Sequence, residues 1–108
     1  MKVVKVFLME KDNKQNSLEN LNVKFVDEFC SKFGGCTTYT ANGYYVGKGG
    51  RVYQDKDLIC EIFVDTKKIF GDSKAMYSYF RDVAKRYQRD AKQESVSVVI
   101  DGHAFIIE

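Results

Sequence analysis

The stretch "CTTYTANGYYVGKGGRVYQDKDLICEIFVD", residues 36–65, decides the fold. Threonine, tyrosine and β-branched residues fill both of its halves, and the glycine-rich step Lys48–Gly50 separates them, which is typical of two strands joined by a tight connection. We interpret Gly47, Gly49 and Gly50 as residues that adopt positive φ in this connection. The segment therefore predicts a long β-hairpin.

Two amphipathic helices flank this hairpin. Before it, apolar residues recur at three- and four-residue intervals after Ser17, which can cap a helix, and Gly34 ends the pattern as a left-handed cap would. After it, Asp72 or Ser73 can cap a second helix with the same spacing. The apolar stripes are Leu18, Leu21, Phe25, Phe29 and Phe33 in the first helix, and Met76, Phe80, Val83, Ala84 and Tyr87 in the second.

Strands are expected at both ends of the chain. Residues 2–9, "KVVKVFLM", form an apolar run of strand length, and the Asp101-Gly102 pair near the end is a strong signal for a second hairpin. No proline, repeat or linker divides residues 1–108, so we expect a single domain. The element order predicts an α+β fold, a ferredoxin-like βαββαβ antiparallel sheet with two helices on one face and an extra C-terminal strand.

With both helices on one side, the other face of the sheet must meet water or a partner. Alternation along the strands assigns both apolar and charged residues to this open face, namely Val3, Lys5, Phe7, Ile59, Glu61, Phe63 and Val99. Because an exposed apolar patch usually marks an interaction site, we expect a homodimer through this face. The alternative is that the terminal strand pair folds back and covers it.

Composition narrows the classes of function. The chain has 17 basic and 15 acidic residues, and this small excess does not favour nucleic acid as a partner. No apolar run approaches the roughly 20 residues that cross a bilayer, so we expect no membrane partner. Three cysteines without CxxC spacing, Cys30, Cys36 and Cys60, fit the cytoplasm and are interpreted as buried or half-buried hydrophobes. The only histidine, His103, follows a tight turn, and we expect no metal or cofactor.

The hairpin connection does not match a phosphate-binding loop. Gly49 follows Lys48 where a P-loop needs Ser or Thr, and a strand resumes at Val52 where both phosphate-binding motifs need a helix. Aromatic and cationic side chains nevertheless gather around it, as a stacked nucleotide would require, although Tyr44 and Tyr45 must lie on opposite faces of the strand. The residues predicted to bind are Tyr39, Tyr44, Tyr45, Lys48, Arg51, Tyr53, Glu61 and Phe63.

Two charged rows leave alternatives open. The carboxylates at Asp55, Asp57, Glu61 and Asp65 occupy odd positions of one strand, and such a row could carry acid–base chemistry, bind magnesium or be a solvated strand face. The second helix has a basic side that could contact nucleic-acid phosphates or simply face water, formed by Arg81, Lys85, Arg89 and Lys92.

Two stretches of the chain resemble a group of uncharacterised small proteins of bacteriophages and mobile elements in low-GC bacteria. These stretches are "KFGGCTTYTANGYYVGKGGRVYQDKDLICEIF" and "QESVSVVIDGHAFII". The shared features are a Gly-Gly segment after the first helix, a Gly-Tyr-Tyr step, a glycine hairpin and a Gln-Glu-Ser start to the final strand region. The resemblance implies the fold and a phage setting, and it implies no particular activity. The matching positions are Gly34, Gly35, Thr37, Gly43, Tyr44, Tyr45, Gly50, Gln93, Glu94 and Ser95.

A short phage protein without an internal catalytic constellation works more often by binding than by catalysis. We therefore expect a binding protein that inhibits a host protein, such as an immune effector, or sequesters a nucleotide signal through its open sheet face and tyrosine-rich hairpin. One alternative is a small hydrolase or lyase acting on a phosphorylated ligand, with Glu61 or Asp55 as base and Arg51 or Lys48 stabilising charge. Another is a nucleic-acid binder that uses the basic second helix.

Overall fold

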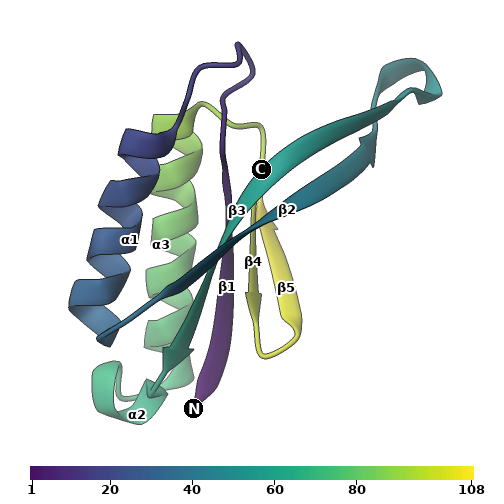
Figure 1. Cartoon of the computed structure of the whole chain (residues 1–108). Helices are drawn as coiled ribbons and strands as arrows, with labels where there is room; N and C mark the ends of the chain where they lie inside the picture. Colours follow the sequence, from purple (N-terminus) through teal and green to yellow (C-terminus); the bar gives the residue numbers. More distant parts are fainter.

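The computed structural model describes all 108 residues and has two layers, a sheet and a pair of helices (Figure 1). The strands are β1 (Lys2–Met9), β2 (Thr37–Val46), β3 (Val52–Val64), β4 (Val96–Ile100) and β5 (His103–Ile107). The helices are α1 (Glu19–Phe33), α2 (Thr66–Ile69) and α3 (Ser73–Ala91). All neighbouring strands are antiparallel in the order β2-β3-β1-β4-β5, with α1 and α3 on one face of the sheet. This is the expected ferredoxin-like arrangement with one added strand.

The core lies between the sheet and the two long helices. Alternate residues of the central strands point towards the helices, and those of β1, of β4 and of β3 from Cys60 to Val64 are buried there. The predicted α3 stripe is buried as a whole, whereas Leu21 and Phe33 of the α1 stripe are only partly buried. The fully buried large residues are Tyr87, Phe29, Phe80, Leu8, Ile62, Met76, Ile100, Val4, Val6, Val64, Val83 and Val98.

The face of the sheet that the helices leave open carries the residues expected from alternation. Cross-strand register pairs Val3 with Phe63, Lys5 with Glu61, and Phe7 with Ile59. The terminal hairpin does not cover this face, because β5 pairs with β4 and extends the sheet at its edge. The alternative of a strand pair folded back over the face is therefore wrong.

Caps define the ends of the long helices. Gly34 has φ of 84° and donates its N–H to the carbonyl of Cys30, which confirms the left-handed end of α1. The Asp72 carboxylate accepts a hydrogen bond from the N–H of Ala75 at 2.9 Å and so begins α3. Ser17 lies one residue too early to be the cap of α1, which is Leu18, although its hydroxyl accepts the N–H of Glu19.

The short helix α2 was not expected from the sequence. It spans only four residues after β3, and Asp65 begins it by accepting the N–H of Lys68 at 3.2 Å. Four residues make about one turn, which is too short for any apolar period to appear in the sequence. Asp65 is therefore a helix cap and not a member of the carboxylate row on β3.

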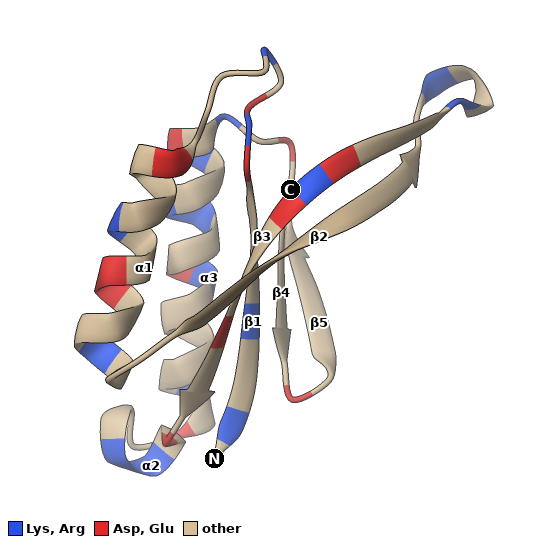
Figure 2. Ribbon diagram, viewed as in Figure 1, with Lys and Arg blue, Asp and Glu red and all other residues tan.

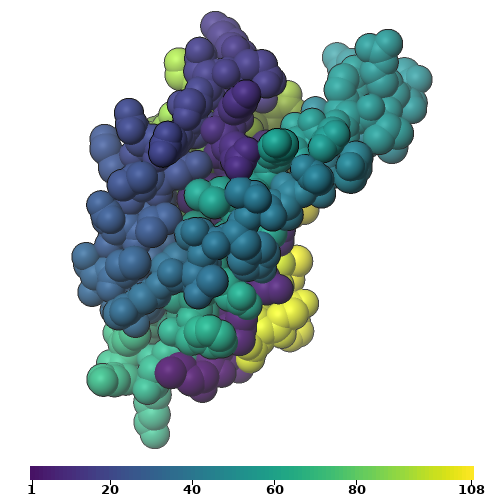
Figure 3. Space-filling model, viewed as in Figure 1, coloured from purple at the N-terminus to yellow at the C-terminus, as the bar shows by residue number.

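The hairpin of β2 and β3 is confirmed, and its tip stands clear of the body of the protein (Figure 3). The connection Lys48–Gly50 forms a turn of 3-10 helix in which Gly49 and Gly50 both have φ of 76°, as expected. Gly47 differs from the expectation, because its φ of −95° is open to any residue. The absence of a side chain at Gly47 must therefore serve something other than backbone conformation.

The three cysteines are all free, and they differ in burial. Cys60 is buried in the core and Cys36 is half-buried, as expected, but Cys30 is exposed on α1. Burial raises the pKa of the Cys36 thiol, so this group stays a neutral thiol at neutral pH. No helix of the structure is long and apolar enough to cross a membrane.

Candidate functional site

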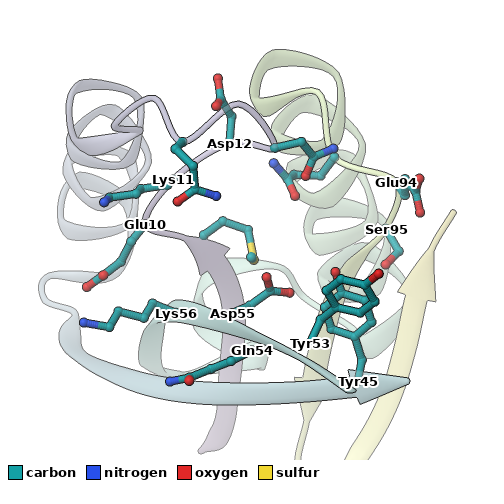
Figure 4. A pocket seen from close by; sticks show the side chains of 14 residues that line it. Glu10, Lys11, Asp12, Tyr45, Tyr53, Gln54, Asp55, Lys56, Glu94 and Ser95 are labelled. Atoms are coloured by element: carbon teal, nitrogen blue, oxygen red, sulfur yellow. The ribbon is translucent and has the colours of Figure 1, made fainter. Parts of the chain in front are cut away.

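A cleft of about 910 Å³ opens at the end of the sheet where β1 leaves it (Figure 4). Three segments that are far apart in the sequence form its walls: the loop after β1, the upper part of the β2–β3 hairpin, and the segment between α3 and β4. Its size falls within the range that small-molecule sites occupy, which is about 300–1,000 Å³. The lining residues are Met9, Glu10, Lys11, Asp12, Asn13, Gln15, Tyr45, Tyr53, Gln54, Asp55, Lys56, Gln93, Glu94 and Ser95.

A stacked tyrosine pair forms one end of the cleft. Tyr45 on β2 and Tyr53 on β3 are directly opposite in the strand register, and their rings stack with centroids 5.4 Å apart. Gly47 makes room for this pair, because a Cβ atom there would lie 2.5 Å from Cε2 of Tyr53. The glycine that the backbone does not require is thus required by the aromatic ring beside it. Both tyrosines remain partly exposed and offer an apolar surface to a flat ligand.

Two carboxylates follow the tyrosines along β3. Asp55 lines the cleft, and Asp57 is half-buried next to it on the same face. Burial, and secondarily the charge of Asp55, raises the pKa of Asp57 above its usual value. A Cβ atom on Gly43 would lie 3.0 Å from Oδ2 of Asp57, so this glycine leaves space for the carboxyl group.

The loop after β1 is held in a fixed shape by Asp12. Its Oδ1 atom accepts hydrogen bonds from the N–H groups of Lys14 at 2.9 Å and Asn16 at 2.8 Å. The hydrogen bond from the Asn16 backbone is the main reason that the pKa of Asp12 is lowered. Because the loop is tied in this way, the side chains of Glu10 and Lys11 are presented to the cleft from a defined backbone.

The segment between α3 and β4 forms the wall opposite this loop. Gln88, in the last part of α3, donates from Nε2 to the carbonyl of Glu94 at 2.9 Å and ties the segment to the helix. Glu94 and Ser95 lie beside the tyrosine end, while Glu10, Lys11 and Lys56 lie at the other end (Figure 4). Desolvation, then Asp55 and Tyr53, raise the pKa of Tyr45, and the charge of Glu94 makes a smaller contribution in the same direction.

The charges of the cleft are unequal in number. It holds four carboxylates, Glu10, Asp12, Asp55 and Glu94, against the two ammonium groups of Lys11 and Lys56. Acidic and basic residues also alternate along the upper part of β3 (Figure 2). A surplus of carboxylates attracts cations and repels phosphates. The structure contains no group of three or more His, Cys, Asp or Glu side chains placed to hold a metal ion.

The residues predicted to bind lie in four separate places. Tyr45 and Tyr53 line the cleft, whereas Tyr44 lies on the opposite face of β2 and is exposed. Lys48 and Arg51 are at the hairpin tip and outside the cleft. The others lie further along the open face of the sheet, where Tyr39 is opposite Ile59 and where Glu61 and Phe63 are opposite Lys5 and Val3.

Two of the three walls of the cleft were not predicted from the sequence. The loop Glu10–Gln15 was interpreted only as a polar connection, and nothing in its composition indicates a cleft. The segment Gln93–Ser95 was singled out only through the proposed resemblance to phage and mobile-element proteins, whose pattern also includes Gly43 and Tyr45. Of these positions, Tyr45 and Gln93–Ser95 line the cleft, and Gly43 leaves space for the carboxyl group of Asp57. Asp55, one of two residues considered as a base, lies in the cleft, and Glu61 does not.

The fold is similar to that of a phage SAM lyase in two solved structures. In complex with S-methyl-5′-thioadenosine, that lyase matches with a TM-score of 0.71 and 18% sequence identity, covering 98% of this chain and 88% of that chain. In the apo state it matches with a TM-score of 0.70 and 19% identity, covering 98% of this chain and 87% of that chain. No protein-family model and no curated protein sequence matches this chain. At this identity the similarity establishes the fold.

This comparison corrects the leading interpretation of the sequence. We expected a binding protein that inhibits a host protein or sequesters a nucleotide signal, and that expectation is contradicted because the matching structures are those of a lyase. The cleft could not be recognised within any single strand or helix, because it is assembled from three segments that are distant in the sequence.

Proposed function

We propose that this protein is a lyase that cleaves S-adenosylmethionine (SAM) or a closely related sulfonium nucleoside in the cleft described above. The observation that carries the proposal is the match along 98% of the chain to a phage SAM lyase that holds S-methyl-5′-thioadenosine. The cleft supports it independently, because its charge favours a cationic ligand and one of its ends is aromatic. A surplus of carboxylates disfavours the phosphorylated ligand considered from the sequence.

The layout of the cleft suits a ligand with an aromatic base at one end and an amino acid at the other. An adenine ring would stack at the Tyr45–Tyr53 end, where base stacking on aromatic side chains contributes about 1–3 kcal/mol. The amino acid group would lie at the end with Glu10, Lys11 and Lys56, whose charges complement an ammonium and a carboxylate. Asp55 lies between the two ends, where the positively charged sulfur of such a ligand would be.

The chemistry that we propose follows from the compound bound in the matching lyase structure. S-Methyl-5′-thioadenosine retains the methyl and adenosyl groups of SAM, so the bond that breaks joins sulfur to the γ-carbon of the four-carbon amino acid. The bonding electrons go to sulfur, which leaves as a neutral thioether and needs no protonation. In the route that we propose, an oxygen of the substrate's own carboxylate attacks the γ-carbon and closes a five-membered lactone. This route needs no proton transfer, so the protein has to bind the folded substrate and exclude water.

In this scheme Asp55 is an electrostatic partner of the sulfonium and not a general base. Its carboxylate steadies the cationic substrate, and the attraction disappears once the product is a neutral thioether, which favours product release. A β-carbon proton of the substrate is too weakly acidic for a side-chain carboxylate to remove. The same reasoning gives Glu61 no part in the reaction, since it lies outside the cleft opposite Lys5.

The test is to incubate the protein with SAM and to measure S-methyl-5′-thioadenosine and the lactone by mass spectrometry against a protein-free control. Asp55→Asn is expected to lower kcat/KM by at least about tenfold, because it removes a charge aimed at the reacting centre. Glu61→Gln is the matched control on the same strand and face, and it should stay within about twofold of wild type. Product formation no faster than in the control, together with no binding of S-methyl-5′-thioadenosine, would contradict the proposal.

We also propose a phage setting, with action in the host cytoplasm. The resemblance to phage and mobile-element proteins supports it, and so does the phage origin of the two matching structures. A homodimer through the open face of the sheet stays a prediction, supported by the exposed Phe63 and Ile106 on that face. Sedimentation of the purified protein measures this directly, and a monomer at all accessible concentrations would contradict it.

A further inference from the structure

Strand β4 stops short of the end of β1, and this leaves Met9, the last residue of β1, without a partner on the side of β4, although it lies opposite Asp57 of β3 on the other side. The register between the two strands pairs Val6 with Val98, so its continuation would place Ser95 opposite Met9. β4 begins only at Val96, and Ser95 lies in the wall of the cleft. The N–H of Glu10 points towards β3, where it donates to the carbonyl of Lys56 at 3.1 Å. Because neighbouring residues of a strand point in opposite directions, the N–H and carbonyl of Met9 face the missing partner.

Two side chains from the core take the place of that partner. The N–H of Met9 donates to Oη of Tyr87 at 2.9 Å, and Nδ2 of Asn22 donates to the carbonyl of Met9 at 2.8 Å. The hydroxyl of Tyr87 donates to Oδ1 of Asn22 at 2.7 Å. The three hydrogen bonds close a ring of Met9, Asn22 and Tyr87, which we call the hydrogen-bonded ring. One helix supplies each side chain, so α1 and α3 both hold the end of β1.

The burial of this ring sets it apart from other polar groups of the molecule. Tyr87 is 0% exposed and Asn22 is 4% exposed, and Asn22 is the one buried residue that is polar or charged. A Phe and a Leu would fill much the same space without polar atoms but would leave both main-chain groups of Met9 unpaired. Burial raises the pKa of Tyr87 to about 12, so the hydroxyl remains a donor at physiological pH.

We infer that Asn22 and Tyr87 are positioning residues of the cleft. They bond to Met9 in place of a residue of β4, and in this way they keep the two walls of the cleft apart. Pairing of Ser95 with Met9 would draw the Gln93–Ser95 wall into the sheet, and the opposite wall begins directly after Met9 at Glu10. The ring satisfies Met9 without that pairing. Its consequence for catalysis rests on the proposed function, whereas its effect on the backbone of the cleft does not.

The test compares two tyrosine-to-phenylalanine variants on the same helix. Tyr87→Phe removes the hydroxyl that closes the hydrogen-bonded ring but keeps the aromatic packing. This packing includes the edge-on contact with Phe25, whose ring centroid lies 5.2 Å from that of residue 87. Tyr79→Phe is the matched control, because its hydroxyl donates to Glu28 in a contact between the helices that does not line the cleft. A second single variant, Asn22→Leu, removes the amide that donates to the Met9 carbonyl, but the hydroxyl of Tyr87 lies 3.2 Å from that carbonyl and can still donate to it, so this variant serves if Tyr87→Phe is too unstable.

Two readouts separate positioning from a general loss of stability. In Tyr87→Phe, hydrogen exchange at the amide of Met9 should become about tenfold faster, and exchange across Lys11–Gln15 should also rise. The kcat/KM for SAM should fall by about tenfold, a change equal to about 1.4 kcal/mol. In Tyr79→Phe at equal thermal stability, both quantities should stay within about twofold of wild type.

The outcomes distinguish this inference from the proposed function. Exchange at Met9 that is the same in the Tyr87→Phe and Tyr79→Phe variants would overturn the inference. If exchange rises as expected but wild-type protein neither binds S-methyl-5′-thioadenosine nor turns over SAM, the positioning of the walls stands and the proposed function fails. If wild-type protein is active and Tyr87→Phe retains full kcat/KM, the ring does not position the site, and the inference fails.

Discussion

The two parts of β3 have the same alternation of side chains between two faces but different surroundings. We call residues 52–57, next to the hairpin tip, the upper part and residues 58–64 the lower part. In the lower part, Cys60, Ile62 and Val64 are fully buried between the sheet and the helices. Around the upper part nothing covers the ribbon, and Tyr44, Val46 and Val52 are 67%, 69% and 63% exposed. A two-stranded ribbon alone is at best marginally stable in water. The body of the sheet therefore supplies the stability, and the hairpin is free to carry residues chosen for a ligand.

The largest effect is expected from a truncation in the body. Phe80 is fully buried and stacks on Phe33 with ring centroids 5.7 Å apart, so Phe80→Ala leaves a cavity and should lower the free energy of unfolding by about 3–5 kcal/mol. Tyr44→Ala, in the exposed part of the hairpin, should change it by less than about 0.5 kcal/mol. Urea denaturation followed by circular dichroism measures both, and equal losses would remove the distinction between the two regions.

A truncation in the hairpin should act on the ligand and not on the fold. Tyr53→Ala removes one ring of the stacked pair, and the affinity for S-methyl-5′-thioadenosine should fall by about 1–3 kcal/mol. Its free energy of unfolding should change by less than about 1 kcal/mol, because the ring is partly exposed. Calorimetric titration measures the affinity, with Tyr44→Ala on the opposite face as control. Equal losses in the two variants would place the ligand elsewhere.

A smaller effect is expected at the junction of the two regions, where burial raises the pKa of Asp57. The folded carboxyl group holds its proton more tightly than the unfolded one, so its contribution favours folding at low pH and is lost as the pH rises through the folded-state pKa. Asp57→Asn should therefore be more stable than wild type at pH 7, by less than about 1 kcal/mol because water screens the half-buried group.

The same measurement at low pH provides the control for Asp57. Below the ordinary carboxyl pKa of 3.8 both side chains are neutral, so the difference between Asp57→Asn and wild type should disappear. Urea titrations at neutral and acidic pH give the comparison. A stabilisation that grows on acidification would mean that the Asp57 carboxylate is favoured in the folded protein, contrary to its burial.

The smallest effect is expected at the hairpin tip, and it tests a prediction made from the sequence. Lys48 and Arg51 were expected to bind, but they lie outside the cleft. The double variant Lys48→Ala with Arg51→Ala should change the affinity for S-methyl-5′-thioadenosine by less than about twofold, because both side chains are exposed outside the cleft, where water and salt screen their charges. A clear loss at physiological salt would extend the binding site to the tip.

The fold could be predicted from the sequence because each element carries a local signal. Alternation in residues 2–9 and 52–64, the apolar stripes of the helices, and the Asp101-Gly102 turn each specify one element and one buried face. The strand order then follows from the short connections between elements. The exceptions, α2 and the cap of α1, concern one turn of helix each.

The site could be predicted only in part, because its geometry depends on distances that the sequence does not contain. Tyr45, Tyr53 and Asp55 were noticed as aromatic or acidic, but they were grouped with Lys48 and Arg51 by closeness in the chain. Because a strand rises by about 3.3 Å per residue, residues only a few positions apart in the chain can lie in different places, some at the tip and some in the cleft. The walls from Glu10–Gln15 and Gln93–Ser95 are brought together by packing of both helices on the sheet, which no local pattern encodes.

Because β3 runs unbroken from the core into the cleft, the protein does not tolerate insertions and deletions equally at all positions of the hairpin. One residue inserted between Tyr53 and Asp57 would turn Tyr53 to the far side of the ribbon, or else force the whole lower half out of register. Residues added at Lys48–Gly50 would disturb neither half. Natural variants of this protein should therefore gain or lose residues at the tip, which is also the place to attach a fluorescent label or a fusion partner.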